Sequence, residues 1–192
     1  MPDYFTLAMT VEEILKRKDP LDHHGRNVST MVVKMAELAN RWNAQEIRML
    51  KWGAYIHDIG KIMLDDTLLN FPRRLTSGEM AKIKIHATAG HEIAVALGCH
   101  PIILDIVRHH HENLNGSGYP DGLSEEEIPV FARWVRVCDF YDAVRSDRVY
   151  RHAMSEEEAF MILEAEAGEI FDPEAVQFLK LALVILNKEK NG

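Results

Sequence analysis

The sequence predicts an all-α domain. Apolar residues recur at intervals of three and four along most of the chain, and no segment alternates convincingly between apolar and polar residues, as a strand would. Capping residues precede several of the apolar runs, and the only glycine-rich segment lies between two of them. A length of 192 residues fits one domain. We expect about seven or eight helices packed around one core.

Short motifs predict where the helices begin. Ser, Thr or Asn followed three residues later by Glu is a capping box, in which each side chain bonds the backbone N–H of the other residue. Apolar residues at the 3.6-residue period predict a half-buried helix, and proline suits a first turn. In chain order, the predicted helices begin at the motifs or runs Thr10–Glu13, Val28–Trp42, Asn43–Glu46, Thr76–Glu79, Pro101, Val130–Val144, Ser155–Glu158 and Asp172–Pro173.

Glycine, proline and polar residues predict the ends and the loops. Gly60 is expected to stop the third helix near Ile59, and residues 61–75 form a polar, proline-bearing loop. The helix that starts at Pro101 is expected to reach about Glu112. Residues 115–122, with three glycines and a proline, are a loop.

Composition limits the classes of partner. Lys and Arg number 22 against 30 Asp and Glu, so the net charge is −8, which argues against binding to nucleic acid polymers or to an anionic membrane. Two cysteines cannot build a disulfide framework, and no apolar run approaches the length of a membrane span. We therefore expect a cytoplasmic protein with a helical extension over residues 1–22 and one domain over residues 23–192.

Ionisable side chains lie on or beside the predicted apolar faces. Buried imidazoles and carboxylates need partners, and metal ions suit both types of ligand. The absence of cysteine from the set argues against a structural zinc site. Other histidines (His91, His100, His109 and His152) are interpreted as surface or packing residues. The candidate ligands are His23 or His24, His57, Asp58, His86, His110, His111 and Asp139.

The adjacent pairs in this set indicate more than one ion. Neighbouring residues on a helix diverge by about 100°, so His57 with Asp58, or His110 with His111, cannot clamp a single ion. Such pairs suit a site in which a carboxylate bridges two ions and imidazoles bind each of them. Two close ions lower the pKa of a water molecule and hold a phosphoryl oxygen, which predicts a hydrolase.

The order of these motifs resembles the HD-GYP branch of the HD phosphohydrolase superfamily. The resemblance rests on HDIGK at residues 57–61, HHENLNGSGYPDGL at 110–123 and CDFYDAVRSDRVYR at 138–151, and it extends from about His23 to Arg151. It implies an all-α fold, a centre of two or three iron or manganese ions, and hydrolysis of cyclic di-GMP to the linear dinucleotide pGpG or to GMP.

The resemblance also implies roles for single residues. Asp58 matches the bridging carboxylate, and Lys61 matches the lysine that meets the scissile phosphate. Arg148 and Arg151 match arginines that hold the substrate, and Tyr119 forms a wall of the site without being catalytic. The metal ligands it implies are His23, His57, Asp58, His86, His110, His111 and Asp139, with His23 preferred over His24 because of its spacing to Arg26.

The sequence departs from this family pattern in two loops. Asn115 stands where the family usually has Asp, and residues 70–73 (Asn-Phe-Pro-Arg) stand in place of Lys-Pro-Gly. Both loops lie beside the site, so these departures bear on substrate preference and rate.

A third ion would need Asp19 as a ligand. Pro20 disfavours the helical turn that would aim Asp19 inward, so we expect two ions.

Two other functions compete with a cyclic dinucleotide phosphodiesterase. One is an HD-type nucleotidase or phosphatase acting on nucleoside phosphates, and the complete GYP loop argues against it. The other is a cyclic dinucleotide receptor with little turnover, and the intact ligand set argues against that. Only about 22 residues precede His23, so regulation is expected from a separate protein, from a second copy of the chain or from the ligand.

Overall fold

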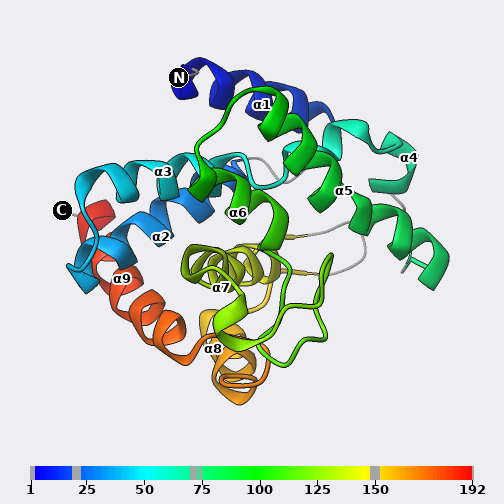
Figure 1. The fold of residues 1–192 in the computed structure, drawn as a ribbon. Coiled ribbons are helices and arrows are strands. Elements are labelled where there is room, and N and C mark those ends of the chain that lie inside the picture. The colour runs from blue at the N-terminus through cyan, green and yellow to red at the C-terminus, as the bar shows by residue number, and fades with distance from the viewer. Residues whose placement is uncertain (1–2, 19–22, 70–72, 74, 148–151, 192) are drawn as a thin grey trace.

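The fold is helical, as the sequence predicts (Figure 1). The computed structural model describes residues 3–18, 23–69, 73, 75–147 and 152–191. Within these residues there are nine α-helices, two short 3-10 helices and no strand. The elements are α1 (Tyr4–Lys18), α2 (His24–Ala39), α3 (Ala44–Tyr55), η1 (Ile59–Met63), α4 (Asp66–Leu69), α5 (Ser77–Ala96), α6 (Pro101–His109), η2 (Glu125–Glu127), α7 (Val130–Arg145), α8 (Glu156–Ala165) and α9 (Pro173–Asn191).

Helix α7 lies at the centre, with α2, α6, α8 and α9 packed around it (Figure 1). Seven of its ten buried residues join apolar side chains of the neighbouring helices in what we call the first core cluster. Trp134 is fully buried there, with its ring 4.8 Å from that of Trp42 and 5.3 Å from that of Phe178. Burial of such large rings makes this cluster the main source of hydrophobic stabilisation.

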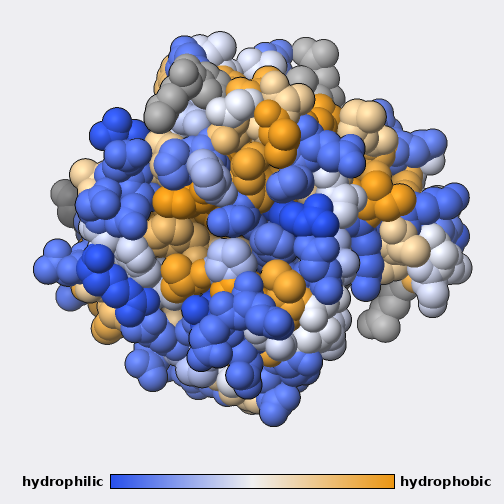
Figure 2. Space-filling model, viewed as in Figure 1, coloured by the Kyte–Doolittle hydropathy of each residue, from blue (hydrophilic) through white to orange (hydrophobic). Residues whose placement is uncertain are grey.

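A second core cluster lies under α1. Tyr4, Ala8 and Val11 of α1 pack against apolar residues of α3, η1, α5 and α6, including Ile59 and Ile103. Helix α6 contributes to both clusters and therefore joins them. No helix in the described part of the chain is long and apolar enough to cross a membrane. The face seen in Figure 2 is mostly hydrophilic, with apolar patches between charged side chains.

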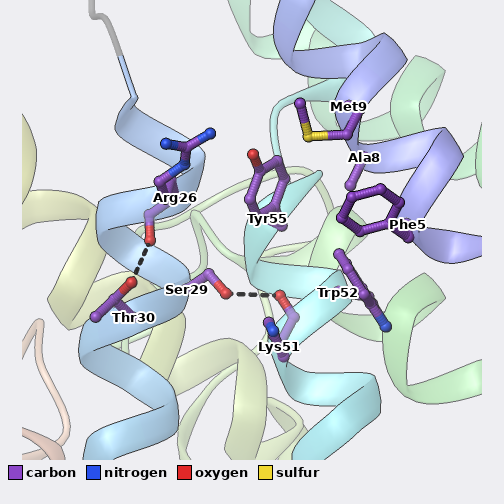
Figure 3. Close-up of a pocket in the computed structure, with 9 residues that line it drawn as sticks. All are labelled: Phe5, Ala8, Met9, Arg26, Ser29, Thr30, Lys51, Trp52 and Tyr55. Carbon is purple, nitrogen blue, oxygen red and sulfur yellow. Dashed lines mark hydrogen bonds between the residues drawn. The ribbon is translucent and has the colours of Figure 1, made fainter.

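A pocket of about 270 Å³ lies where α1 packs beside α2 and α3 (Figure 3). Phe5 and Trp52 supply its apolar lining, and the opposite wall carries Ser29, whose hydroxyl donates to the carbonyl oxygen of Lys51 at 3.0 Å. None of the candidate metal ligands lines this pocket. The candidate centre is therefore a separate feature of the fold.

The predicted helix starts are largely confirmed. The capping boxes at Asn43, Thr76 and Ser155 are all formed, and Pro101 is the first residue of α6. Asp172 caps α9 by accepting from the backbone of the second and third residues of that helix. These boundaries were predictable because they depend on contacts between residues two or three positions apart.

The predicted start of the first helix is wrong. Helix α1 begins at Tyr4, six residues before Thr10, because the carboxylate of Asp3 accepts from the backbone N–H of Phe5 at 3.1 Å. The hydroxyl of Thr10 instead donates to the carbonyl oxygen of Thr6, one turn earlier. Asp3 therefore caps the first helix in place of the predicted Thr10.

Candidate metal centre

Five segments of the chain bring the candidate ligands together. His24 begins α2, His57 and Asp58 precede η1, His86 lies on α5, His110 and His111 follow α6, and Asp139 lies on α7. Most of these side chains are buried, and His111 is half-buried. Helix α6 ends at His109 rather than at Glu112, so His110 and His111 leave the helix and turn toward the others.

Gly60 allows this convergence and does so differently from its predicted role. Helix α3 ends at Tyr55, and Gly60 lies inside η1 rather than stopping a helix near Ile59. A Cβ atom on Gly60 would lie 1.9 Å from the carbonyl oxygen of His86. The missing side chain therefore lets η1 touch α5, which sets Asp58 beside His86.

Asp58 lies between two groups of imidazoles. Its Oδ1 is 3.3 Å from His86 Nε2 and 3.9 Å from His110 Nε2. Its Oδ2 is 3.4 Å from His57 Nε2 and 3.9 Å from His24 Nε2. Two sets of ligand atoms close enough to hold an ion share this carboxylate, one with His86, His110 and His111, the other with His24 and His57. The expectation that adjacent residues cannot bind one ion together is therefore wrong, because both pairs lie just beyond the end of a helix and are not held to its spacing of about 100°.

Backbone carbonyls fix the orientation of three rings. Nδ1 of His57 lies 2.7 Å from the carbonyl oxygen of Ala54, Nδ1 of His86 lies 2.8 Å from that of Ile83, and Nδ1 of His110 lies 3.0 Å from that of Val107. A carbonyl oxygen only accepts, so each Nδ1 carries the proton and each Nε2 presents its lone pair to the cluster. This is the tautomer that binds a metal through Nε2.

The residues fit a divalent metal. His57 Nε2 and Asp58 Oδ1 are buried and have no hydrogen-bond partner within the described residues. Leaving such atoms unpaired costs free energy, and an ion bound between them would remove that cost. Neutral imidazole and carboxylate together suit iron, manganese and zinc. The cluster is therefore a divalent-metal site in its chemistry.

Without a metal ion, some side chains of the cluster are charged and others are neutral. Burial alone would raise the pKa of Asp58, but Lys61 at 2.7 Å and the imidazoles hold it well below its usual value. Burial lowers the pKa of His110 to about 3. For His24, burial is opposed by Asp139 and Asp142, which raise its pKa to about 10. His24 is thus the protonated ring of the metal-free site.

We expect the metal-free protein to be most stable near pH 6.5. Burial lowers the pKa values of His86, His110 and His111 from 6.5, so the unfolded chain binds more protons below that pH and stability is lost as the pH falls. The raised pKa of His24 gives stabilisation that is present below pH 6.5 and lost as the pH rises toward about 10.

The measurement is the melting temperature in chelator across this pH range. His24→Asn serves as the matched variant, because it should flatten the alkaline side of the profile and leave the acid side in place. A melting temperature that keeps rising through pH 9 would contradict the prediction.

The structure places His24, not His23, in the cluster. His23 adopts a left-handed conformation before the helix, with φ of 65°, and α2 begins at His24. Nε2 of His24 is 3.1 Å from Asp139 Oδ1. The expectation of His23 is corrected accordingly, because the two adjacent side chains leave the backbone in different directions at the start of the helix.

Asp142 is a residue that the sequence reasoning missed. Its Oδ2 accepts from Nδ1 of His24 at 2.7 Å, so it orients that ring as carbonyls orient the others. Asp142 follows Asp139 by three residues on α7, and such residues share a helix face. That spacing was the signal in the sequence that could have identified it.

Replacing Asp142 with asparagine should weaken metal binding by about 10- to 100-fold, because a neutral amide oxygen replaces the charged acceptor that orients the ring of His24 and raises its basicity. The measurement is the metal Kd by competition with a chelator. Asp147→Asn, at an exposed aspartate five residues later, is the matched control and should leave Kd unchanged. An unchanged Kd in the Asp142 variant would show that this carboxylate does not act on the centre.

Residues 115–122, which we call the GYP segment, border the cluster. The ring of Tyr119 stacks on His111 at 4.7 Å, and Lys84 Nζ lies 4.7 Å from the Tyr119 ring centroid. Buried Glu112 anchors the segment, since its Oε1 accepts from the backbone N–H of Asp121 at 2.8 Å. A Cβ atom on Gly118 would lie 2.5 Å from the backbone of Glu112, so glycine is required there.

The remaining candidate residues fall into two groups. Asn115 is exposed, and its side chain accepts from the backbone N–H of Ser117 at 3.0 Å, while Arg73 pairs with Glu79. Both therefore shape loops. The predicted substrate and third-metal residues Arg148, Arg151, Asp19 and Asn70 lie outside the described residues.

Comparisons with known proteins identify a family model and several relatives. A family model described as HD domain matches residues 9–175. The chain is 40% identical over 137 residues to the cyclic di-GMP phosphodiesterase response regulator RpfG of Xanthomonas campestris, which covers 70% of this chain and 36% of that protein. It is 34% identical over 140 residues to 3'3'-cGAMP-specific phosphodiesterase 3 of Vibrio cholerae, with coverages of 73% and 30%.

Solved structures share the fold, among them the following one. Bd1817, an HDG"Y"P protein from Bdellovibrio bacteriovorus, superposes with a TM-score of 0.70 at 23% identity, over 85% of this chain and 52% of that one. The chain spans about a third of the length of the curated relatives it matches.

Proposed function

This chain belongs to the HD domain family, and from that premise we propose that it is a metal-dependent phosphodiesterase acting on a cyclic dinucleotide. The first candidate substrate is cyclic di-GMP, with pGpG or GMP as the product. The observation that carries the proposal is the position of Asp58, which lies between two groups of imidazoles and beside Lys61. The names of the relatives support the class of substrate.

We propose two ions of iron or manganese. His86, His110 and His111 would hold one with Asp58, and His24 and His57 would hold the other with the same carboxylate. When bound, the ions supply Lewis-acid polarisation of a phosphoryl oxygen and a water molecule of lowered pKa. Asp139, with its Oδ2 3.7 Å from His111 Nδ1 and its Oδ1 3.1 Å from His24 Nε2, is placed to complete the ligand set of either ion.

The chain's own residues position the phosphate. Nζ of Lys61 is held at the edge of the cluster by its 2.7 Å contact with Asp58 Oδ2. An ammonium group there offsets negative charge that develops on the phosphoryl oxygens. Tyr119, stacked on His111, forms an apolar wall beside the reacting group and limits the access of water. The site thus combines the ammonium group of Lys61 with the apolar ring of Tyr119.

The test is turnover of a nucleotide panel by protein purified without oxygen, with the metal content measured on the same sample. The panel contains cyclic di-GMP, 3'3'-cGAMP, GTP and guanosine polyphosphates. We expect cleavage of a cyclic dinucleotide by protein that holds about two ions per chain. Release of phosphate from the linear nucleotides alone would replace the proposal with a nucleotidase, and tight binding without cleavage would replace it with a receptor.

A further inference from the structure

Arg136 is a charged residue next to the centre that has no part in the proposed ligand set. It lies on α7, one turn before Asp139, and its side chain is half-buried. Its guanidinium donates to the side chain of Asn113, which lies between His111 and Tyr119 in the chain. Burial lowers the pKa of His111 and raises that of Tyr119, and the charge of Arg136 adds to the first shift and opposes the second. The residue therefore lies on the side of the cluster that faces the GYP segment.

Two contacts hold the guanidinium in place. Nε and Nη2 donate to the side-chain oxygen of Asn113 at 3.3 and 3.2 Å, and Cζ lies 5.1 Å from the ring centroid of Phe171. Both partners are neutral. Within the described residues, no carboxylate oxygen lies within 4.0 Å of Arg136. Arg133, one turn earlier on the same helix, does pair with a carboxylate, that of Asp172 at 3.4 Å.

Among the residues that the structure describes, the guanidinium therefore has no carboxylate at ion-pair distance. Burial lowers the pKa of Arg136 because the protonated form loses solvation there, and arginine nevertheless stays protonated in proteins. Nη1 makes no hydrogen bond within the described residues. A guanidinium fixed on one edge by an amide and a ring, with donors left over on the other, is suited to an oxyanion such as a phosphate.

We propose that Arg136 binds the phosphate of the cyclic dinucleotide that is not cleaved. This inference rests on the proposed function, because only a substrate with two phosphates needs a second anion site. In the proposed function Lys61 on η1 meets the scissile phosphate, whereas Arg136 lies on α7 one turn before Asp139 and is hydrogen-bonded to Asn113. The two cations thus come from different elements, and each neutralises one of the two charges of the substrate.

The test compares two substrates in metal-reconstituted full-length protein. Cyclic di-GMP carries two phosphodiesters, and bis(p-nitrophenyl) phosphate carries one. For Arg136→Met we expect KM for cyclic di-GMP to rise about 10- to 100-fold with kcat changed by less than about threefold, since the contact is a charge-assisted hydrogen bond outside the reacting group. Hydrolysis of bis(p-nitrophenyl) phosphate should stay within about threefold of the parent protein.

Two further variants separate binding from folding. Arg136→Lys keeps the charge and should recover part of the loss in KM, which a purely structural role in holding Asn113 would not predict. Arg41→Met is the matched control, because Arg41 also contacts a ring and makes two side-chain hydrogen bonds, but these form an exposed ion pair with Glu174. Metal content and melting temperature are measured for every variant.

The outcomes distinguish this inference from the proposed function. If the parent protein cleaves cyclic di-GMP and Arg136→Met leaves its KM unchanged, the inference is overturned and the proposed function stands. An equal loss on both substrates also overturns it, because Arg136 would then act on the centre itself. If the parent protein cleaves bis(p-nitrophenyl) phosphate but no cyclic dinucleotide, the proposed function fails and the inference fails with it.

Discussion

Replacing Asp58 with alanine is expected to abolish turnover, with a fall in kcat of about 10³-fold or more. Its two carboxylate oxygens face different groups of imidazoles, and the two sets of ligand atoms share this residue. The same change removes the buried partner of Lys61. Metal bound only to the folded protein stabilises it, so the variant should also lose the difference in melting temperature between metal-loaded and chelated samples.

The measurements are kcat, metal content per chain and the two melting temperatures. Asp105→Asn, at a half-buried aspartate on α6 that belongs to neither ligand set, is the control and should behave like the parent protein. An Asp58→Ala protein that retains its full metal content would show that the ions bind elsewhere in the chain.

Replacing Lys61 with alanine should lower kcat by about 100-fold while KM changes little. The reason is that an ammonium 2.7 Å from Asp58 Oδ2 acts mainly on charge that develops in the transition state rather than on charge present in the bound substrate. Steady-state kinetics on the metal-loaded protein separate the two parameters. Lys34→Ala, at a lysine paired with Glu189 on the surface, is the control of matched residue type.

The predicted roles of Arg148 and Arg151 give a contrast within the same assay. Replacement of either by alanine should raise KM and leave kcat near that of the parent protein, because a residue that holds the substrate binds ground state and transition state alike. Equal and mild effects from Lys61, Arg148 and Arg151 would indicate a binding module rather than an enzyme.

The sequence predicts helix starts correctly where they depend on contacts between residues close together in the chain. Asn43, Thr76 and Ser155 mark true helix starts because each capping box closes within four residues. The sequence also predicted that histidines and aspartates gather in one cluster, since such residues on apolar helix faces need partners wherever the helices lie.

The sequence was insufficient where a position depends on contacts between distant segments. Gly60 was interpreted as a helix stop, but glycine is required there because a Cβ atom would collide with the backbone of His86, against which η1 packs. His23 and His24 could not be separated, because the choice depends on the residue at which α2 begins. The spacing of Asp142 from Asp139 marks it as a candidate, but its partner His24 cannot be identified from the sequence, because α2 and α7 are far apart in the chain and pack together only in the fold.

The position of the candidate centre between the two core clusters has a consequence for the cooperativity of unfolding. His24 and Asp139 belong to helices of the first cluster, whereas Asp58 and His86 belong to segments packed on the second. An ion bound by both sets acts as a cross-link between two sub-structures that otherwise share α6 and α3. In native-state hydrogen exchange, the loaded protein should therefore open as one unit, and the chelated protein should open as two, with α1, η1 and α5 exchanging before α7 and α9.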